Sequence, residues 1–139
     1  MGEANYYLKA TFKDAATLEK QLPSLRAFFE EGWNAYNFWQ RNRSAPAYKF
    51  WPKFKSQFPL ATELLGKRVD GDCNNALAGE IDFVSLEDAV FKADGNALYY
   101  GGMVWHFADW RPLCKFLKTK FGATTVDYYS DEYSRTPAG

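Results

Sequence analysis

Apolar residues recur with the period of a strand in some segments of the chain and with the period of a helix in others. Residues 5–13 (NYYLKATFK) are rich in β-formers and alternate in polarity, which predicts a strand. Asp14 is a good N-cap for the segment that follows. Its apolar residues are spaced by three and four: Leu18, Leu22, Leu25, Phe29, Trp33 and Tyr36. We therefore expect a helix that ends between residues 41 and 45, is kinked or restarted at Pro23 and is weakened at Gly32.

A helical insertion is expected over residues 46–66. Residues 47–65 have apolar side chains spaced by four, and Pro52 and Pro59 should interrupt them. Gly66 is placed to end this helical segment as its C-cap. Residues 67–79 have the composition of turns, and we expect a flexible loop there.

The second half of the chain is expected to contain a hairpin. Residues 80–93 are strand-like, with a break at residues 85–88. Asp94-Gly95 separates them from a second strand-like run, residues 97–107, and this dipeptide favours a tight turn. Gly101-Gly102 within that run predicts either a β-bulge or a close approach of another backbone.

The last third of the chain predicts one more helix and one more strand. Asp109 should cap a helix over residues 110–121, and Gly122 should end it. Its apolar face is Leu113, Phe116, Leu117 and Phe121, and its outward face is Lys115, Lys118 and Lys120. Residues 123–129 predict a strand, and we expect the tail over residues 130–139 to be frayed.

The expected order is strand, helices, strand, strand, helix, strand. This order resembles the split βαβ, ferredoxin-like plan with a helical insertion after the first helix. The resemblance implies an α+β fold, with an antiparallel sheet and helices on one face. A length of 139 residues is that of a single domain, residues 1–139, and the aromatic content of 19% supplies large side chains for a core.

Charge is segregated along the chain although the formal net charge is zero. Residues 32–62 contain five bases, nine aromatic residues and no acid, whereas residues 69–139 contain 11 acids and six bases. A local basic surface is compatible with this balance, but a general DNA-coating protein, usually basic overall, is not expected.

Residues 32–62, the basic–aromatic segment, have two interpretations. Their aromatic rings either face a core, with the bases on the solvated side, or are partly exposed and bind a partner. The candidate binding residues are Trp39, Arg41, Arg43, Tyr48, Lys49, Trp51, Lys53, Phe54 and Lys55.

The main functional hypothesis is a non-enzymatic module that binds a partner protein through the basic–aromatic segment, with exposed rings around Tyr48, Trp51 and Phe54. A homodimer through the same surface is included, and a small regulator or inhibitor of the mobile-element type is one form of such a module. The alternative is single-stranded nucleic acid, with the bases on phosphates and Trp39 or Trp51 stacking. The strand over residues 97–107 is aromatic but lacks a base, so the sheet is not expected to be an RNA platform.

A small enzyme that uses Cys114 or His106 is a further alternative, and no cofactor is expected. His106 is the only histidine, and the two cysteines form no CxxC pair that could bind zinc. Asp70 and Asp72 resemble the start of a calcium loop, but Asn75 replaces the glycine that the loop requires. The N-terminus has no secretory signal and no apolar run spans a membrane, which favours a cytoplasmic protein.

Overall fold

The computed structural model describes residues 4–42, 44–66, 83–104 and 109–130. Its helices are α1 (Ala15–Asn42), α2 (Ala47–Gln57), α3 (Pro59–Leu65) and α5 (Arg111–Phe121). Its strands are β1 (Ala4–Thr11), β2 (Val90–Asp94), β3 (Ala97–Val104) and β4 (Thr125–Ser130). The described part of the chain therefore has the α+β class that the sequence predicts. The expected flexible loop over residues 67–79 lies outside the described residues. Of the expected frayed tail over residues 130–139, Ser130 is instead buried and paired in β4, and the rest lies outside the described residues.

The described strands form one antiparallel sheet in the order β2-β3-β1-β4. A hairpin joins β2 to β3, and Asp94 pairs with Ala97 across its two-residue loop. Gly95 opens the loop with a φ of 62°, which L side chains rarely adopt. The tight turn expected at Asp94-Gly95 is confirmed.

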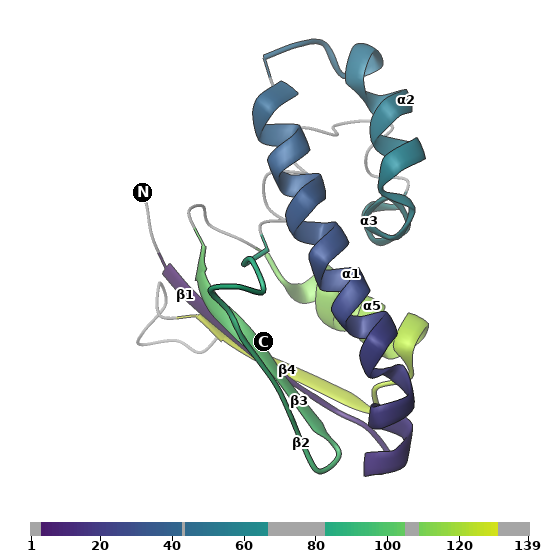
Figure 1. Cartoon of the computed structure of the whole chain (residues 1–139), viewed down its shortest axis with the longest axis vertical. Helices are drawn as coiled ribbons and strands as arrows, with labels where there is room; N and C mark the ends of the chain where they lie inside the picture. Colours follow the sequence, from purple (N-terminus) through teal and green to yellow (C-terminus); the bar gives the residue numbers. More distant parts are fainter. Residues whose placement is uncertain (1–3, 43, 67–82, 105–108, 131–139) are drawn as a thin grey trace.

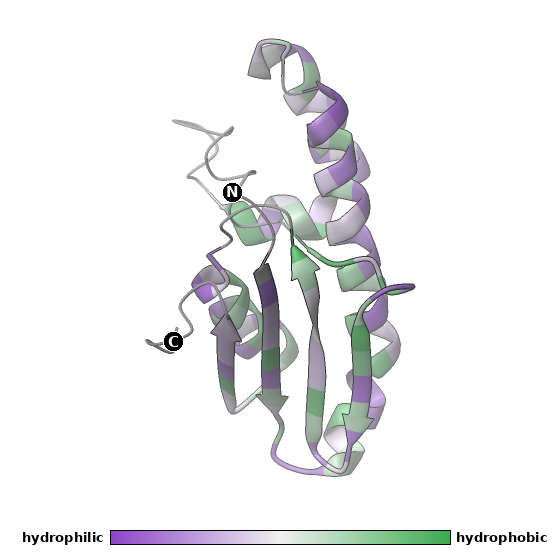
Figure 2. Ribbon diagram, turned by 90° about the vertical axis from the view of Figure 1, so that its left-hand side faces the viewer, coloured by the Kyte–Doolittle hydropathy of each residue, from purple (hydrophilic) through white to green (hydrophobic). Residues whose placement is uncertain are grey.

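Helices cover one face of the sheet, and no helix of the described part of the chain covers the other face (Figure 1). On β1, Tyr6, Leu8 and Ala10 are buried against the helices, and the residues between them point to the opposite side. Figure 2 looks onto this opposite side, with the helices behind the sheet. We call it the open sheet face and define it by the outward residues of the four strands.

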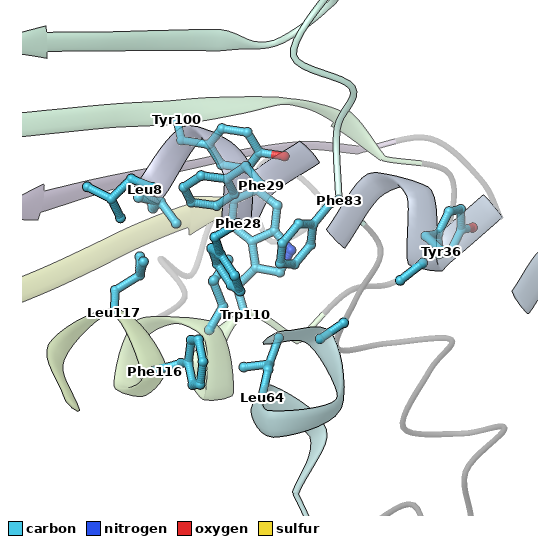
Figure 3. Packing of buried hydrophobic residues seen from close by; sticks show 14 of the residues in the cluster. Leu8, Phe28, Phe29, Tyr36, Leu64, Phe83, Tyr100, Trp110, Phe116 and Leu117 are labelled. Carbon is cyan, nitrogen blue, oxygen red and sulfur yellow. The ribbon is translucent and has the colours of Figure 1, made fainter. Parts of the chain in front are cut away.

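The core beneath the sheet is built largely of aromatic rings from distant segments (Figure 3). Phe29 of α1 stacks on Tyr100 of β3, with ring centroids 4.0 Å apart. Phe28 contacts Phe83 at 5.7 Å and Phe116 of α5 at 5.2 Å between centroids. Ring pairs of this kind add about 0.5–1.5 kcal/mol each beyond the area that they bury.

The first helix runs without interruption through Pro23, so the expected restart there is wrong. A proline leaves the carbonyl four residues earlier without its helical hydrogen bond. Pro23 and Glu19 are both exposed, so water can reach that carbonyl. Gly32 is also tolerated in this helix, because the ring of Phe83 packs directly against it.

The helical insertion divides at one of its two prolines. The α2 helix continues through Pro52, and the break falls at Phe58, with a φ of −128° and a ψ of 68°. Phe58 precedes Pro59, and the proline ring disfavours the helical conformation of the residue before it. The Gly66 N–H donates to the Thr62 carbonyl at 3.0 Å, which confirms the expected end of the segment.

The strand expected over residues 80–93 is shorter than the sequence pattern indicates. Regular pairing begins at Val90, residues 83–89 are irregular, and residues 80–82 lie outside the described part. Phe83 and Val84 are nevertheless buried, because they enter the core instead of pairing with a strand. Burial of apolar side chains therefore gave this segment a strand-like pattern.

Glycine at position 101 marks a close backbone approach. The pairing of β1 with β3 is continuous through Gly101 and Gly102, so no bulge is present. A Cβ on Gly101 would lie 2.3 Å from the Tyr6 carbonyl oxygen and 2.4 Å from the Tyr7 ring. Of the two expectations for the glycine pair, close approach is confirmed.

The expected helix ends are largely confirmed. The Asp14 carboxylate accepts a hydrogen bond from the Thr17 N–H at 2.8 Å. Hydrogen bonds from the side chain and the backbone N–H of Thr17 lower the pKa of Asp14. The expected cap at Asp109 is wrong, because α5 begins at Arg111 and Trp110 occupies the N-cap position without a side-chain cap hydrogen bond. Asp109, one residue further out, accepts the Arg111 N–H at 3.1 Å and pairs with the Arg111 guanidinium at 2.9 Å. Gly122 ends α5 in the left-handed conformation.

Candidate functional site

Two of the predicted binding rings are buried, and for them the expectation of exposure is wrong. Phe54 has no exposed surface, and Trp39 is 4% exposed. Phe38 explains the burial of Phe54: its ring contacts Phe50, Phe54 and Phe58 at centroid distances of 6.5, 6.1 and 5.5 Å. The four-residue spacing of Phe50 and Phe54 on α2 and of Phe58 at its C-cap thus points three phenylalanines at α1, so these rings form core.

Trp51 is the remaining described ring of the predicted site, and it is half-buried. Its ring stacks on Phe54, with centroids 5.0 Å apart, and the Lys55 ammonium lies 5.9 Å from its centroid. These contacts already occupy much of the indole surface that a ligand would use. The side chain of Tyr48 lies outside the described part, and so does Arg43.

Four of the predicted cations are exposed on this helical unit. Arg41 at the end of α1 and Lys49, Lys53 and Lys55 on α2 are exposed. We call these four residues the basic surface. Within the described ranges none of them lies within 4.0 Å of a carboxylate, whereas Lys120 pairs with Glu63 at 3.2 Å. The structure therefore leaves these four cations exposed, whereas Trp39 and Phe54, which were predicted to accompany them, are buried.

A second surface, which the sequence interpretation missed, lies on the open sheet face. Four large hydrophobic side chains are exposed among the described residues: Tyr7 at 42%, Val90 at 47%, Met103 at 42% and Tyr129 at 43%. They come from all four strands, and the strand register places every one of them on the open sheet face. Concentrated exposure of this kind marks an interaction surface more often than scattered single residues do.

The register arranges the open sheet face in level rows across the four strands. One row reads Val90, Gly101, Tyr7 and Tyr129 in the order β2-β3-β1-β4. The next row reads Lys92, Tyr99, Lys9 and Asp127, and the third reads Asp94, Ala97, Thr11 and Thr125. The charged residues of these three rows are thus two lysines and two aspartates.

Local contacts orient the rings at the centre of the face. The Tyr7 ring leans across onto Gly101, where a side chain would collide with it. Such covering of a glycine by a cross-strand aromatic ring stabilises the strand pair. The Lys9 ammonium lies 5.8 Å from the centroid of the Tyr99 ring. The two tyrosines are therefore held by their neighbours on the adjacent strands.

The reason for not expecting the sheet to be an RNA platform is wrong. That reason was the lack of a base on the strand over residues 97–107. In the sheet, Tyr99 has Lys92 on one side and Lys9 on the other, because the lysines come from the neighbouring strands. Alternation along the strands could have indicated the outward residues, but the neighbours across the sheet depend on long-range pairing.

Cys114 does not have the environment of a nucleophile. It is a free, buried cysteine, and burial raises the pKa of its thiol from 9.0 to about 12. The thiol is therefore protonated near neutral pH, whereas the thiolate is the reactive form. The other catalytic candidate, His106, lies outside the described residues, as do Asp70, Asp72 and Cys73.

One hollow of the described surface has a single titratable side chain along it. A hollow of about 320 Å³ lies between α3 and α5, lined by Leu64, Leu65, Pro112, Lys115, Phe116 and Thr119. Lys115 is the one titratable side chain along it, so no acid–base pair is formed there. No group of three or more His, Cys, Asp or Glu among the described residues could hold a metal ion.

Among the described helices, none has the combination of length and apolar character that a bilayer span requires. Comparison of the chain with protein-family models, with curated proteins and with solved structures gave no match.

Proposed function

We propose that the chain is a non-enzymatic protein-interaction module that binds its partner on the open sheet face. The observation that carries the proposal is that every exposed large hydrophobic side chain of the described residues lies on this one face. Tyrosine and methionine are enriched in protein–protein interfaces, where they provide large contact areas. This location replaces the basic–aromatic segment, whose rings are mostly core.

The proposal includes a ferredoxin-like plan for the fold and a cytoplasmic location. The antiparallel order β2-β3-β1-β4 supports the plan, because β3 lies between β1 and β2 as in a split βαβ unit. Two isolated cysteines are typical of a reducing compartment and support the location.

The open sheet face, where the proposed partner binds, has no net charge. Lys9 and Lys92 are balanced by Asp94 and Asp127, so electrostatic steering by this face is weak. Tyr7 and Tyr129 are paired across β1 and β4 and form the widest ring surface of the face. We expect them to be the residues whose removal weakens binding most.

A capture experiment with paired variants tests the proposal. The tagged chain is mixed with lysate and with an untagged copy, and retained proteins are identified by mass spectrometry. We expect Tyr7→Ser combined with Tyr129→Ser to weaken retention about tenfold or more. The matched control, Lys49→Ser combined with Lys53→Ser on the basic surface, should retain the same protein as the parent chain. Circular dichroism and thermal unfolding show that both variants fold.

The opposite pattern would refute the location of the site. If the tyrosine variant retains the partner and the lysine variant loses it, the basic surface is the docking site. If the parent chain captures neither a second copy nor any stoichiometric partner, the interaction module itself is refuted.

Single-stranded nucleic acid on the basic surface is the second candidate, favoured by the absence of carboxylates around its cations in the described part. Lysine and arginine that neutralise phosphates make affinity fall steeply with salt. Fluorescence anisotropy with single-stranded DNA and RNA at low and high salt tests it. No binding at low salt, or binding that Lys53→Ala leaves unchanged, would eliminate this candidate.

A further inference from the structure

We infer that the partner of the open sheet face is the open sheet face of a second copy of this chain, related by a two-fold axis that runs along the strands. The inference rests on the proposed function and names its partner. It follows from the order of side chains across the sheet, which is complementary to itself when reversed.

The geometry of such a pair is simple. Two sheets that pack face to face keep their strand directions within about 30° of each other. A two-fold axis between β3 and β1, parallel to the strands, reverses the strand order and keeps each row level with itself. In the pair, β2 of one copy therefore faces β4 of the other, and β3 faces β1.

The two-fold rotation places the row that contains Lys92 and Asp127 opposite the same row of the second copy, and the facing side chains are complementary. Lys92 on β2 faces Asp127 on β4 of the second copy, and Tyr99 on β3 faces Lys9 on β1. The first contact joins opposite charges, and the second places an ammonium group at an aromatic ring. Both contacts occur twice, because an isologous interface repeats each of them.

The row that contains Val90 and Tyr129 likewise faces the same row of the second copy. Val90 faces Tyr129, so the exposed aliphatic side chain of one edge covers the exposed ring of the other edge. Tyr7 leans onto Gly101 and hence toward the line between β1 and β3. The two-fold axis lies on that line, so the Tyr7 rings of the two copies come together there.

The third row adds polar contacts of matching chemistry. Asp94 faces Thr125, a hydrogen-bond acceptor opposite a donor, and Ala97 faces Thr11. All three rows therefore pair without setting like charges against each other. A polyanion finds no such match, because two aspartates share the face with the two lysines.

The area of the open sheet face indicates how strongly the two copies should bind each other. The four strands are between 5 and 8 residues long. At about 4.8 Å between strands and about 3.3 Å per residue, they span a plane of roughly 400 Å². That is smaller than the roughly 800 Å² per partner of a standard interface, so the pair should be reversible. We expect a dissociation constant between about 1 μM and about 1 mM.

Charge reversal across the axis provides a specific test by sedimentation velocity over a concentration series. In Lys92→Asp, the introduced acid faces Asp127 of the second copy, and in Asp127→Lys the introduced base faces Lys92. Each variant alone should dimerise at least about tenfold more weakly than the parent chain. An equimolar mixture of the two should restore dimers, because in the mixed dimer one contact joins the introduced acid to the introduced base and the other is the native Lys92–Asp127 pair. Lys118→Asp, exposed on α5, is the control and should dimerise like the parent.

The outcomes separate this inference from the proposed function. A parent chain that stays monomeric up to about 1 mM overturns the second copy as partner. The proposed function survives that result if the Tyr7 and Tyr129 variant loses another captured protein. Dimers that neither charge variant weakens, or a mixture that does not recover, also overturn the inference, since the copies then meet elsewhere or in another register.

Discussion

The Tyr100 hydroxyl exchanges two hydrogen bonds with the backbone of Val84. It accepts from the Val84 N–H at 2.8 Å and donates to the Val84 carbonyl at 2.7 Å. Both residues are buried. The Tyr100 hydroxyl therefore satisfies both the N–H and the carbonyl of Val84, which lies outside the strands and has no sheet partner for them. The contact fixes the segment that carries Phe83 into the core and holds it beneath the sheet.

Replacement of Tyr100 by phenylalanine should destabilise the protein. The ring remains, but the buried N–H and carbonyl of Val84 lose their partner, which costs about 1–3 kcal/mol. Urea unfolding measures the loss, and hydrogen exchange at Val84 should accelerate. Tyr99→Phe, the neighbouring residue on the open sheet face, is the matched control and should change the unfolding free energy much less. Equal effects of the two substitutions would contradict a structural role for the Tyr100 hydroxyl.

Glu31 should make the stability depend on pH. Its carboxylate accepts the Ala61 N–H at 2.8 Å and so joins α1 to the start of α3. Desolvation raises the pKa of Glu31 above 4.5, while hydrogen bonds from the Ala61 and Leu60 N–H groups act in the opposite direction. A raised pKa means that folding favours the protonated form, so this contribution to stability is present below about pH 4.5 and is lost as the pH rises.

Comparison with Glu31→Gln isolates that dependence. We expect the stability of the parent chain relative to the variant to fall between pH 4 and pH 7, measured by urea unfolding at both values. Glu30→Gln, on the adjacent exposed residue, is the control for a general loss of one charge. A difference that is constant with pH, or that changes in the opposite direction, would contradict the predominance of desolvation.

Gly32→Ala should destabilise the protein, although alanine favours a helix by about 1 kcal/mol. A Cβ at this position would lie 2.2 Å from the Phe83 ring, which is itself buried. Overpacking of this kind typically costs about 1–3 kcal/mol. Ser24→Ala, exposed on the same helix, should be neutral or stabilising.

A second substitution tests whether contact between the new Cβ and the Phe83 ring is what destabilises the Gly32→Ala variant. Combining Gly32→Ala with Phe83→Leu should cost less than the sum of the two single changes, because the smaller side chain makes room. Thermal unfolding of the four proteins forms the cycle. Strict additivity, or stabilisation by Gly32→Ala alone, would exclude the contact as the cause.

Cys114 should react slowly with alkylating reagents in the folded protein. Burial raises the pKa of its thiol to about 12, so the reactive thiolate is scarce at pH 8. The experiment uses a Cys73→Ser background, so that a single thiol is observed by mass spectrometry. We expect reaction to become rapid only in denaturant. Rapid alkylation without denaturant would revive the enzyme alternative that uses Cys114.

The pH dependence for Cys114 has the same sign as for Glu31 but a different window. The neutral thiol contributes stability that is fully present below about pH 9 and is lost as the pH rises toward 12. Replacement of Cys114 by alanine should flatten the unfolding free energy over that alkaline range. A dependence that is the same in the variant would assign it to other groups.

Local sequence determined the elements and several of their ends. The N-cap at Asp14, the turn at Gly95 and the C-cap at Gly122 depend on residues within a few positions, and each was predicted correctly. The apolar face of α5 follows from its helical spacing for the same reason. The α+β class then follows from the order of elements.

Tertiary structure alone decided which rings are exposed and which strands are neighbours. Phe54 is buried because Phe38 of another helix packs on it, and the spacing of α2 does not specify that contact. Tyr99 lies between Lys9 and Lys92 because Lys9, 90 positions earlier in the sequence, pairs with it in the sheet. Periodicity identifies a face of an element, whereas the partner of that face is set by long-range packing.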